Sequence, residues 1–429
     1  MAVERYAGSV GGLTWMSLDM NSYFASVEQQ LRPELRGRPV AVVPVQADNT
    51  SCIAASYEAK RYGVGTGTKV FEARGLCPDL EIVEARPPLY VQTHEKILAA
   101  VDSVLPIDKV TSIDEMLCKM GLRQREPDAA IAVARQVKKA VQDQVGEHLL
   151  CSIGLAPNRF LAKMAGKMQK PDGLTTLSTE DLPHKLYSLS LRDLTGIGGR
   201  MHARLERAGV STVEQLCACS KDELRLIWNG VVGERWWYAL RGHDLPEQQT
   251  RRRTLGHSHV LPPEFRTPEG AKAVLVRLVH KAAARLRKLG YWAGGLAVSL
   301  SCARREKWKS STPLTPCQDT RTMVQALSAL WKHRPSAGTP LKVSVVLYDL
   351  VHDACRTPPL FVEDGRGPEL TLAMDAVNNR FGANTVYLAA MHRSLHTAPS
   401  RIAFTHIPDI AVETTRGAEL SESFKASAS

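Results

Sequence analysis

The sequence predicts an α+β protein of several domains, and three observations support that prediction. The chain has 429 residues, which is more than one hydrophobic core usually serves. Residues 1–177 alternate apolar runs typical of strands with stretches of helical apolar spacing, and residues 178–244 show only short helical patterns. Residues 254–350 follow the order strand, helix, strand, strand, helix, strand. We therefore expect two sheet domains with a helical domain between them.

The elements of the first region follow from the spacing of apolar residues. Strands are expected at residues 13–20, 40–45, 81–83, 109–112, 116–120 and 149–155, and helices at 90–104 and 129–145. Pro157-Asn158 opens a further helix over 159–168. Lys170-Pro171-Asp172-Gly173 ends that helix, because proline and glycine both resist helix continuation.

The last module has the clearest boundaries. Its expected elements are residues 254–261, 268–289, 295–303, 308–315, 320–331 and 341–350. Thr267 is placed to cap the first helix, with Pro268 at the first helical position. A polar stretch before the module, at 242–250, has the composition of a linker. The residues from about 412 onward are expected to be disordered.

Charge is distributed unevenly along the chain. Residues 251–310 hold fourteen Lys and Arg against three acids, so this segment carries as much net charge as the whole chain, +11. A solvated helix face would explain some of these cations but not a block this one-sided. Such a block predicts a polyanionic partner.

Several classes of protein are excluded. No apolar stretch approaches the roughly 20 residues that span a membrane, and the N-terminus lacks the layout of a secretion signal, so we expect a cytoplasmic protein with no membrane partner. The nine cysteines are scattered without any Cys-x-x-Cys pair, and Cys217 and Cys219 are too close together for a zinc knuckle. Reduced, mostly buried thiols are expected.

Two acidic motifs stand far apart in the chain, Ser17-Leu18-Asp19-Met20-Asn21 and Ser112-Ile113-Asp114-Glu115. Each lies at the end of an apolar run. Three carboxylates on neighbouring strand ends can hold two Mg²⁺ ions roughly 4 Å apart, an arrangement that serves phosphoryl transfer. Either motif alone is better explained as an ordinary polar turn, so the prediction of a nucleotide-handling enzyme depends on what else the chain carries.

Two further motifs concern binding. Gly196-Ile197-Gly198 lies between short helical patterns, as in a helix-hairpin-helix, whose backbone amides bind phosphate without reading sequence. A glycine-rich helix connection is the alternative. Tyr23 and Phe24 follow the first acidic motif, where an aromatic ring could press on the sugar of a bound nucleotide; for one of the two, a core position is the alternative.

Taken together, the motifs resemble those of the Y-family (DinB/UmuC-type) translesion DNA polymerases over roughly residues 13–350. The resemblance rests on segments in the family's order: 18–28, 55–64, 112–115, 152–154, Asn158, 161–163, 170–173 and 196–198. It implies a multidomain right-hand polymerase fold. The implied domains are a palm (1–22 and 83–177), small fingers (23–82), a helical thumb (178–244, helix-hairpin-helix near 194–216), a linker (245–253), a β-α-β-β-α-β little finger (254–350) and a C-terminal tail (351–429).

The resemblance also implies an activity and residue roles. The activity is template-directed, low-fidelity DNA synthesis past damaged bases, with primer–template DNA and deoxynucleoside triphosphates as partners and two Mg²⁺ ions as cofactor. Asp19, Asp114 and Glu115 would be catalytic and would hold metal together with the Met20 carbonyl. Phe24 would be the steric gate that excludes the 2′-hydroxyl. The remaining roles are nucleotide binding for Tyr23, Tyr57, Lys60 and Lys170, and DNA binding for Gly196, Gly198, Arg251, Arg252, Arg253, Arg304 and Arg305.

Three departures from the family pattern qualify the resemblance. Asn21 stands where DinB-type members carry a second Asp, which favours the UmuC-like branch. Ala54 replaces a residue that often contacts phosphate. Near Leu360-Phe361 only two positions of a sliding-clamp peptide remain, so clamp binding rests on a degenerate motif, and a need for accessory mutagenesis subunits is left open.

Two other hypotheses compete with the polymerase. One is a catalytically silent family member that acts as a DNA-binding scaffold in a mutagenesis complex. The presence of all three carboxylates argues against it, since silent members lose them. The other, a helix-hairpin-helix protein that is no polymerase, leaves the acidic motifs unexplained.

Overall fold

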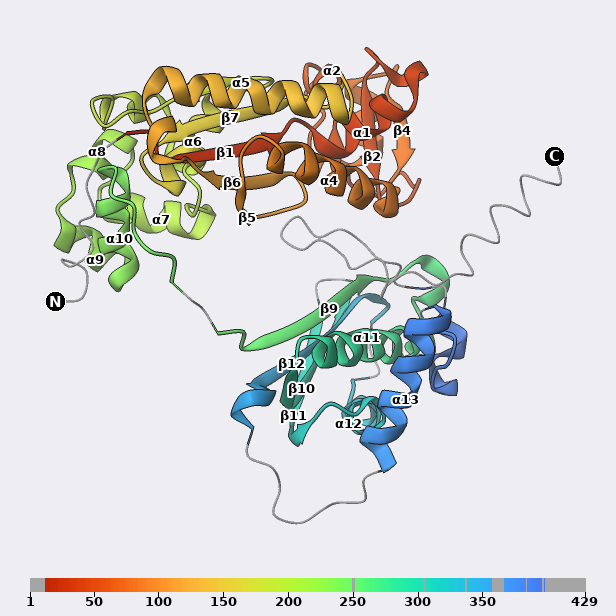
Figure 1. Cartoon of the computed structure of the whole chain (residues 1–429). Coiled ribbons are helices and arrows are strands. Elements are labelled where there is room, and N and C mark those ends of the chain that lie inside the picture. The colour runs from red at the N-terminus through yellow and green to blue at the C-terminus, as the bar shows by residue number, and fades with distance from the viewer. Residues whose placement is uncertain are drawn as a thin grey trace. The chain divides into compact units, whose positions relative to one another are not determined.

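The computed structural model describes residues 12–248, 251–303, 306–335, 338–356, 366–382, 384–395 and 397. The chain divides into two compact units, with the boundary after Gln248 (Figure 1). Each unit has its own sheet and its own hydrophobic core. No helix in the described ranges is long and apolar enough to cross a membrane.

A five-stranded sheet in the order β5-β6-β1-β7-β8 forms the centre of the first unit. Its central strand, β1, pairs antiparallel with both neighbours and is almost wholly buried, which is why its sequence is mostly apolar. The strands are β1 (Trp15–Met20), β5 (Ile107–Val110), β6 (Glu115–Lys119), β7 (Cys151–Ala156) and β8 (Leu174–Thr176). Helices α4 (Pro87–Asp102), α5 (Pro127–Gln144) and α6 (Arg159–Met168) pack on these strands.

Helix α6 lies unusually close to the sheet because Gly154 on β7 has no side chain. A Cβ atom on Gly154 would come within 2.1 Å of the Ala162 carbonyl oxygen and 2.2 Å of the Gly166 nitrogen, both on α6. Asn158 starts the helix by accepting a hydrogen bond from the Leu161 N–H at 2.8 Å. This close packing brings the polar face of α6 to the end of β1.

A smaller sheet, β3-β2-β4, lies mostly within the segment predicted as fingers (23–82), and its strand β4 extends two residues beyond that segment. Its strands are β2 (Val40–Val43), β3 (Ala54–Ala55) and β4 (Glu81–Glu84), and its helices are α1 (Tyr23–Leu31), α2 (Tyr57–Lys60) and α3 (Val70–Leu76). Strand β3 was not expected, because two residues are too few to show periodicity. Ala54, which replaces a residue that often contacts phosphate in the family, is one of the two and is buried.

Short helices follow, as the sequence predicts for residues 178–244. They are the 3₁₀ turns η4 (His184–Ser188) and η5 (Leu191–Asp193), and helices α7 (Gly199–Arg207), α8 (Val213–Ala218), α9 (Lys221–Trp228) and α10 (Val231–Leu240). Side chains of Thr212 and Ser220 cap α8 and α9. Their apolar residues share one core with α6. Further single turns of 3₁₀ helix lie at η2 (Pro33–Leu35) and η3 (Leu122–Gln124).

The second unit confirms the predicted β-α-β-β-α-β order. Its elements are β9 (Thr254–Val260), α11 (Pro268–Lys288), β10 (Tyr291–Cys302), β11 (Lys307–Cys317), α12 (Thr320–Lys332) and β12 (Pro340–His352), with short turns at η6 (Pro263–Phe265) and η8 (Asp353–Cys355). The sheet is antiparallel in the order β11-β10-β12-β9, and both helices pack against it. The Thr267 hydroxyl accepts from the Gly270 N–H at 3.0 Å, as predicted for the cap of α11.

The region assigned to the tail contains structure that the sequence did not predict. Helix α13 (Arg366–Phe381) and the 3₁₀ segment η9 (Ala389–Ser394) follow the module, and Asp375 on α13 binds the Arg287 guanidinium with two hydrogen bonds of 2.6 and 2.8 Å. Leu370 and Leu372 are exposed, so α13 lacks a continuous buried stripe and its docking depends on such polar contacts. The predicted disordered end lies outside the described residues.

The structure corrects one interpretation of the basic block. Arg277 is only 4% exposed among the apolar residues of α11, and the Arg287 side chain is largely covered by Asp375. Both cations lie on the packed side of α11 and are unavailable to a surface partner. Burial without a counter-charge also lowers the pKa of Arg277, to about 10.

Candidate active site

Three carboxylates meet at one end of the five-stranded sheet. Asp19 on β1 and Glu115 on β6 are directly opposed in the antiparallel register, which places their Cα atoms roughly 4.5–5.5 Å apart. Asp114 precedes Glu115 in the turn from β5, and its carbonyl accepts from the Met20 N–H at 2.8 Å. The structure thus brings together all four residues that the sequence assigns to a metal site.

The three carboxyl groups differ in pKa. Burial raises the pKa of Asp19 to about 6, opposed by Lys170 and assisted by the charges of Glu115 and Asp114. Burial also raises the pKa of Asp114, against a hydrogen bond from Ser112. Burial would raise the pKa of Glu115 too, but the hydrogen bond and charge of Lys163 lower it on balance. Three carboxylates that are close together and partly buried can all be ionised only if positive charge lies nearby.

Lysines supply that charge. The Lys170 Nζ atom lies 2.5 Å from the Asp19 carboxylate, and the Lys163 Nζ atom lies 2.5 Å from that of Glu115. Lys167, one turn beyond Lys163, has a pKa lowered by burial and by Lys163, with Glu115 and Asp19 acting in the opposite direction. Sequence reasoning missed Lys163 and Lys167. Their i, i+4 spacing on α6 is the signal that could have found them.

Asn21 holds the turn that carries Lys170. Its side chain is buried, donates to the Ser152 hydroxyl at 3.0 Å and accepts from the Asp172 N–H at 2.7 Å. These bonds join the end of β1 to β7 and to the 170–173 turn. Asn21 therefore has a structural role at this position.

Tyr57 and Lys60, in the segment predicted as fingers, lie near the Asp19 carboxylate. Lys60 donates to the Ser22 hydroxyl at 2.7 Å and lies 4.2 Å from the centre of the Tyr57 ring. Burial and then Lys170 lower the pKa of Lys60, and Asp19 opposes them. Burial and then Asp19 raise the pKa of Tyr57. Tyr57, Lys60 and Lys170 are therefore all within electrostatic reach of Asp19.

The aromatic pair rests on a buried support. The Phe24 ring stacks on Tyr90, with centroids 4.6 Å apart and planes 15° from parallel. The Tyr90 hydroxyl donates to the buried Glu28 carboxylate at 2.8 Å, and Arg86 neutralises that carboxylate. Tyr23 uses its hydroxyl to bond the Tyr90 carbonyl at 2.6 Å. Phe24 and Tyr23 are each 4% exposed, so the pair is packed tightly beside the carboxylates.

The glycine hairpin lies beside α6. Gly196 has a φ of 106°, which favours glycine, whereas a Cβ atom on Gly198 would meet open space. The backbone before α7 can therefore be approached closely from outside. Lys167 joins the hairpin to α6 through the Thr195 hydroxyl at 3.0 Å. The hairpin's first arm consists of 3₁₀ turns in place of the expected helix.

The predicted DNA contacts of the second unit are only partly described. Arg251, Arg252 and Arg253 are exposed ahead of β9. Arg304 and Arg305 lie outside the described residues, as does the degenerate clamp motif at Leu360-Phe361.

The donor set fits Mg²⁺ by its chemistry, since two opposed carboxylates, a third in the adjoining turn and a backbone carbonyl are the hard oxygen ligands this ion prefers. Within the described ranges no group of three or more His, Cys, Asp or Glu side chains is arranged to hold a metal ion as it stands. Lys163 and Lys170 instead balance one carboxylate each.

Comparisons with known proteins agree with this fold. Residues 18–167 match the impB/mucB/samB family, and residues 252–357 match the C-terminal domain of that family. DNA polymerase IV of Moorella thermoacetica is 37% identical over 380 residues, covering 86% of this chain and 94% of the relative. DNA polymerase IV of Pelotomaculum thermopropionicum is 32% identical, covering 86% of this chain and 93% of the relative.

Solved structures support the fold alone. A chimeric Y-family polymerase built from Dbh and Dpo4 superposes with a TM-score of 0.67 at 21% identity, covering 79% of this chain and 99% of that chain. An insertion ternary complex of Dbh DNA polymerase gives a TM-score of 0.52 at the same identity and coverage.

The chain belongs to the impB/mucB/samB family, the Y family of DNA polymerases. Its relatives are DNA polymerase IV enzymes, and it is a DNA-directed DNA polymerase of translesion synthesis. These relatives give no support to the UmuC-like branch that Asn21 suggested. In this structure the Asn21 amide bonds Ser152 and Asp172, and these contacts carry no information about branch.

Proposed function

We propose that DNA synthesis takes place at the cluster of Asp19, Asp114 and Glu115, with primer–template DNA and deoxynucleoside triphosphates as substrates. The observation that carries this proposal is the direct opposition of Asp19 and Glu115 across β1 and β6, with Asp114 in the adjoining turn. Residues about a hundred positions apart in sequence meet there for no evident structural gain, because the crowding of like charges is unfavourable.

The carboxylates and the Met20 carbonyl would hold two Mg²⁺ ions. When bound, these ions would stabilise the attacking and leaving oxygens of nucleotidyl transfer. The protein's own contribution is to keep these oxygens at one strand end and partly buried, where opposite charge acts more strongly than in water. Asp19 and Glu115 would exchange their lysine partners for the ions.

Lys60, Lys170 and Tyr57 would bind the triphosphate. Three groups converge beside Asp19, two of them cationic and one a hydroxyl donor. A nucleotide that develops negative charge during transfer needs such partners held in place beforehand. Once a metal ion takes its place at Asp19, the Lys170 ammonium would be free to pair with phosphate oxygens.

Phe24 would exclude ribonucleotides, and Tyr23 would support it from the core. The stacking of Phe24 on Tyr90 fixes the ring, because Tyr90 is itself bound to Glu28. A ring that cannot retreat can reject a 2′-hydroxyl by contact alone.

DNA would be held through its backbone. The amides at Gly196 and Gly198 and the exposed Arg251, Arg252 and Arg253 suit phosphate contacts, and Arg304 and Arg305 remain proposals from sequence. Contacts of this kind place the duplex without reading its sequence, as copying of any template requires.

Primer extension tests the proposal. Purified protein with Mg²⁺, four deoxynucleotides and a labelled primer–template should extend the primer, and Asp114→Ala should abolish extension while retaining DNA binding. As a matched control, Asp128→Ala changes an exposed aspartate on α5 and should leave extension intact. Extension by the Asp114 variant would refute the assignment of the site. Tight DNA binding by a wild type that does not extend would favour the scaffold hypothesis.

A further inference from the structure

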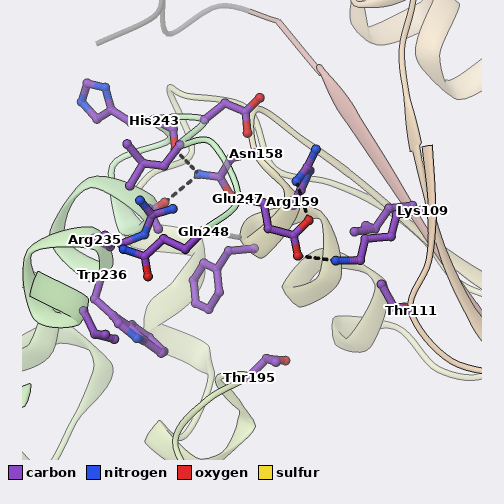
Figure 2. Close-up of a pocket in the computed structure, with 16 residues that line it drawn as sticks. Lys109, Thr111, Asn158, Arg159, Thr195, Arg235, Trp236, His243, Glu247 and Gln248 are labelled. Atoms are coloured by element: carbon purple, nitrogen blue, oxygen red, sulfur yellow. Dashed lines mark hydrogen bonds and ion pairs between the residues drawn. The ribbon is translucent and has the colours of Figure 1, made fainter. Parts of the chain in front are cut away.

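A pocket of about 480 Å³ lies in the first unit between the β5–β6 edge of the sheet, the start of α6 and helix α10 (Figure 2). Its volume falls in the range of roughly 300–1,000 Å³ typical of small-molecule sites. Its lining includes none of the carboxylates, lysines or aromatic residues assigned above to catalysis or nucleotide binding. The proposed reaction therefore leaves this pocket unexplained.

Apolar and aromatic side chains form much of the pocket wall. Phe160 and Trp236 meet edge to face, with centroids 4.9 Å apart, and Leu117, Val232 and Ala239 complete the wall. A planar apolar group would find both a ring face and aliphatic contacts here.

Two cations stand at one side of the pocket and share the Glu247 carboxylate, and Arg159 also pairs with Asp108 at 3.3 Å. Glu247 accepts from the Lys109 ammonium with one oxygen and from Arg159 with the other, the latter at 3.4 Å (Figure 2). The hydrogen bond from Lys109, together with the positive charges of Lys109 and Arg159, lowers the pKa of Glu247, so its carboxyl group is ionised at neutral pH. Its side chain is 53% exposed. Ion pairs this exposed are weak and exchange readily.

The chain just before Glu247 is held more firmly. The Trp15 indole N–H donates to Asp244 at 2.8 Å, and the Asn158 amide donates to the carbonyls of Ala239 and His243 at 2.8 and 3.1 Å. Trp15 and Asn158 are buried. We call residues 245–248 the strap. Glu247 can leave its cations while the anchor at residues 239–244 stays in place.

We propose that this pocket binds a small amphiphilic anion, a molecule with an apolar ring and one carboxylate, sulfonate or phosphate group. In the absence of this ligand, the Glu247 carboxylate occupies the position of the ligand's anionic group. The strap itself has this chemistry, since Leu245 and Glu247 both line the pocket. The ligand's anion would take the place of the Glu247 carboxylate between Lys109 and Arg159. Arg235 also holds the strap, through a hydrogen bond to the Pro246 carbonyl at 2.5 Å.

The probe 1-anilinonaphthalene-8-sulfonate has the required ring and anion. We would titrate it into the full chain and follow its fluorescence by energy transfer from tryptophan. Glu247→Gln should bind the probe about threefold to fivefold more tightly, because a competing exposed ion pair accounts for about that factor. Val232→Glu, which adds a negative charge at a half-exposed lining position, should weaken binding at least tenfold.

Leu226→Glu is the matched control for Val232→Glu, because Leu226 is an 80% exposed apolar residue on α9 that does not line the pocket. It should bind the probe as the wild type does. Any of three results would overturn the proposal: equal probe affinity of Val232→Glu and Leu226→Glu, no increase in probe affinity of Glu247→Gln, or no probe binding by the wild type.

Discussion

At the scale of the residue, the site is a balance of charges. Asp19, Asp114 and Glu115 are close enough to disturb one another's pKa, and Lys163 and Lys170 offset part of that cost. The sequence motifs predict that these carboxylates form a site, because the acids sit at the ends of apolar runs. They did not find Lys163, whose importance depends on where α6 lies.

Acid should inhibit the enzyme through Asp19. The pKa of this group is raised to about 6, so it gains a proton as the pH falls through that value and can no longer hold a cation. Nucleotide incorporation should decline below about pH 6, and a higher Mg²⁺ concentration should move the midpoint to lower pH, since metal and proton compete.

Unfolding should not explain that decline. A carboxyl whose pKa is higher in the folded than in the unfolded chain binds protons more tightly when folded, so acidification toward the unfolded value near 3.9 adds stability from this group. Incorporation rates and unfolding transitions measured at the same pH values would separate the two effects. A pH midpoint of incorporation that does not change with Mg²⁺ concentration would contradict the assignment of Asp19 to the metal site.

Sugar discrimination should depend on Phe24. Phe24→Ala removes the ring stacked on Tyr90, and incorporation of ribonucleotides relative to deoxynucleotides should rise roughly 10–200-fold, the range expected when a pocket is enlarged beside the substrate. Phe71→Ala makes the same change at an exposed phenylalanine on α3 and should have no effect. Single-nucleotide incorporation gives both ratios, and unchanged discrimination would remove Phe24 from this role.

At the scale of the element, close packing decides which side chains reach the site. Helix α6 carries Lys163 and Lys167 to the carboxylates because Gly154 lets it lie against β7. Its limits could be predicted from Asn158 and the proline–glycine turn, since capping is local. The distance of α6 from the sheet could not be predicted, because it depends on Gly154, which lies on strand β7. Helix α13 escaped prediction for a similar reason, because the Arg287 side chain that binds it belongs to α11.

Asp375→Ala should loosen α13. The change removes both hydrogen bonds to Arg287, which is left without its carboxylate partner in a mostly buried position. We expect the second unit to lose about 1–3 kcal/mol of stability and the amides of α13 to exchange faster. Asp353→Ala, at an exposed aspartate of the same unit, should leave α13 protected. Equal protection of α13 in both variants would show that apolar contacts hold it.

At the scale of the whole molecule, the residues proposed for catalysis and for DNA binding are divided between two units. The first holds the carboxylates and the glycine hairpin, and the second begins with the exposed run Arg251, Arg252 and Arg253. Composition alone located the basic module, but it overstated the surface charge, because Arg277 and Arg287 point into the packing of α11.

Neutralising the arginine run should weaken DNA binding without regard to sequence. Replacing Arg251, Arg252 and Arg253 by Gln should flatten the dependence of log affinity on log salt by about one for each phosphate no longer neutralised, and so by up to about three. Replacing Lys96, Arg135 and Lys139, exposed on α4 and α5, makes the same change in net charge and should leave the slope almost unchanged. A weaker affinity for some sequences only would indicate base readout.

The sequence by itself determined the class of fold and the order of elements in the second unit, and it predicts the carboxylates of the proposed site. These features are encoded locally, in apolar periodicity, caps, turns and short motifs. Only the tertiary structure decided that Asp19 faces Glu115, that Lys163 and Lys170 neutralise them, that Asn21 holds a turn, and that Glu247 occupies a cationic pocket. These facts depend on strand register and close packing between distant segments, and no local pattern of residues fixes the distance between them.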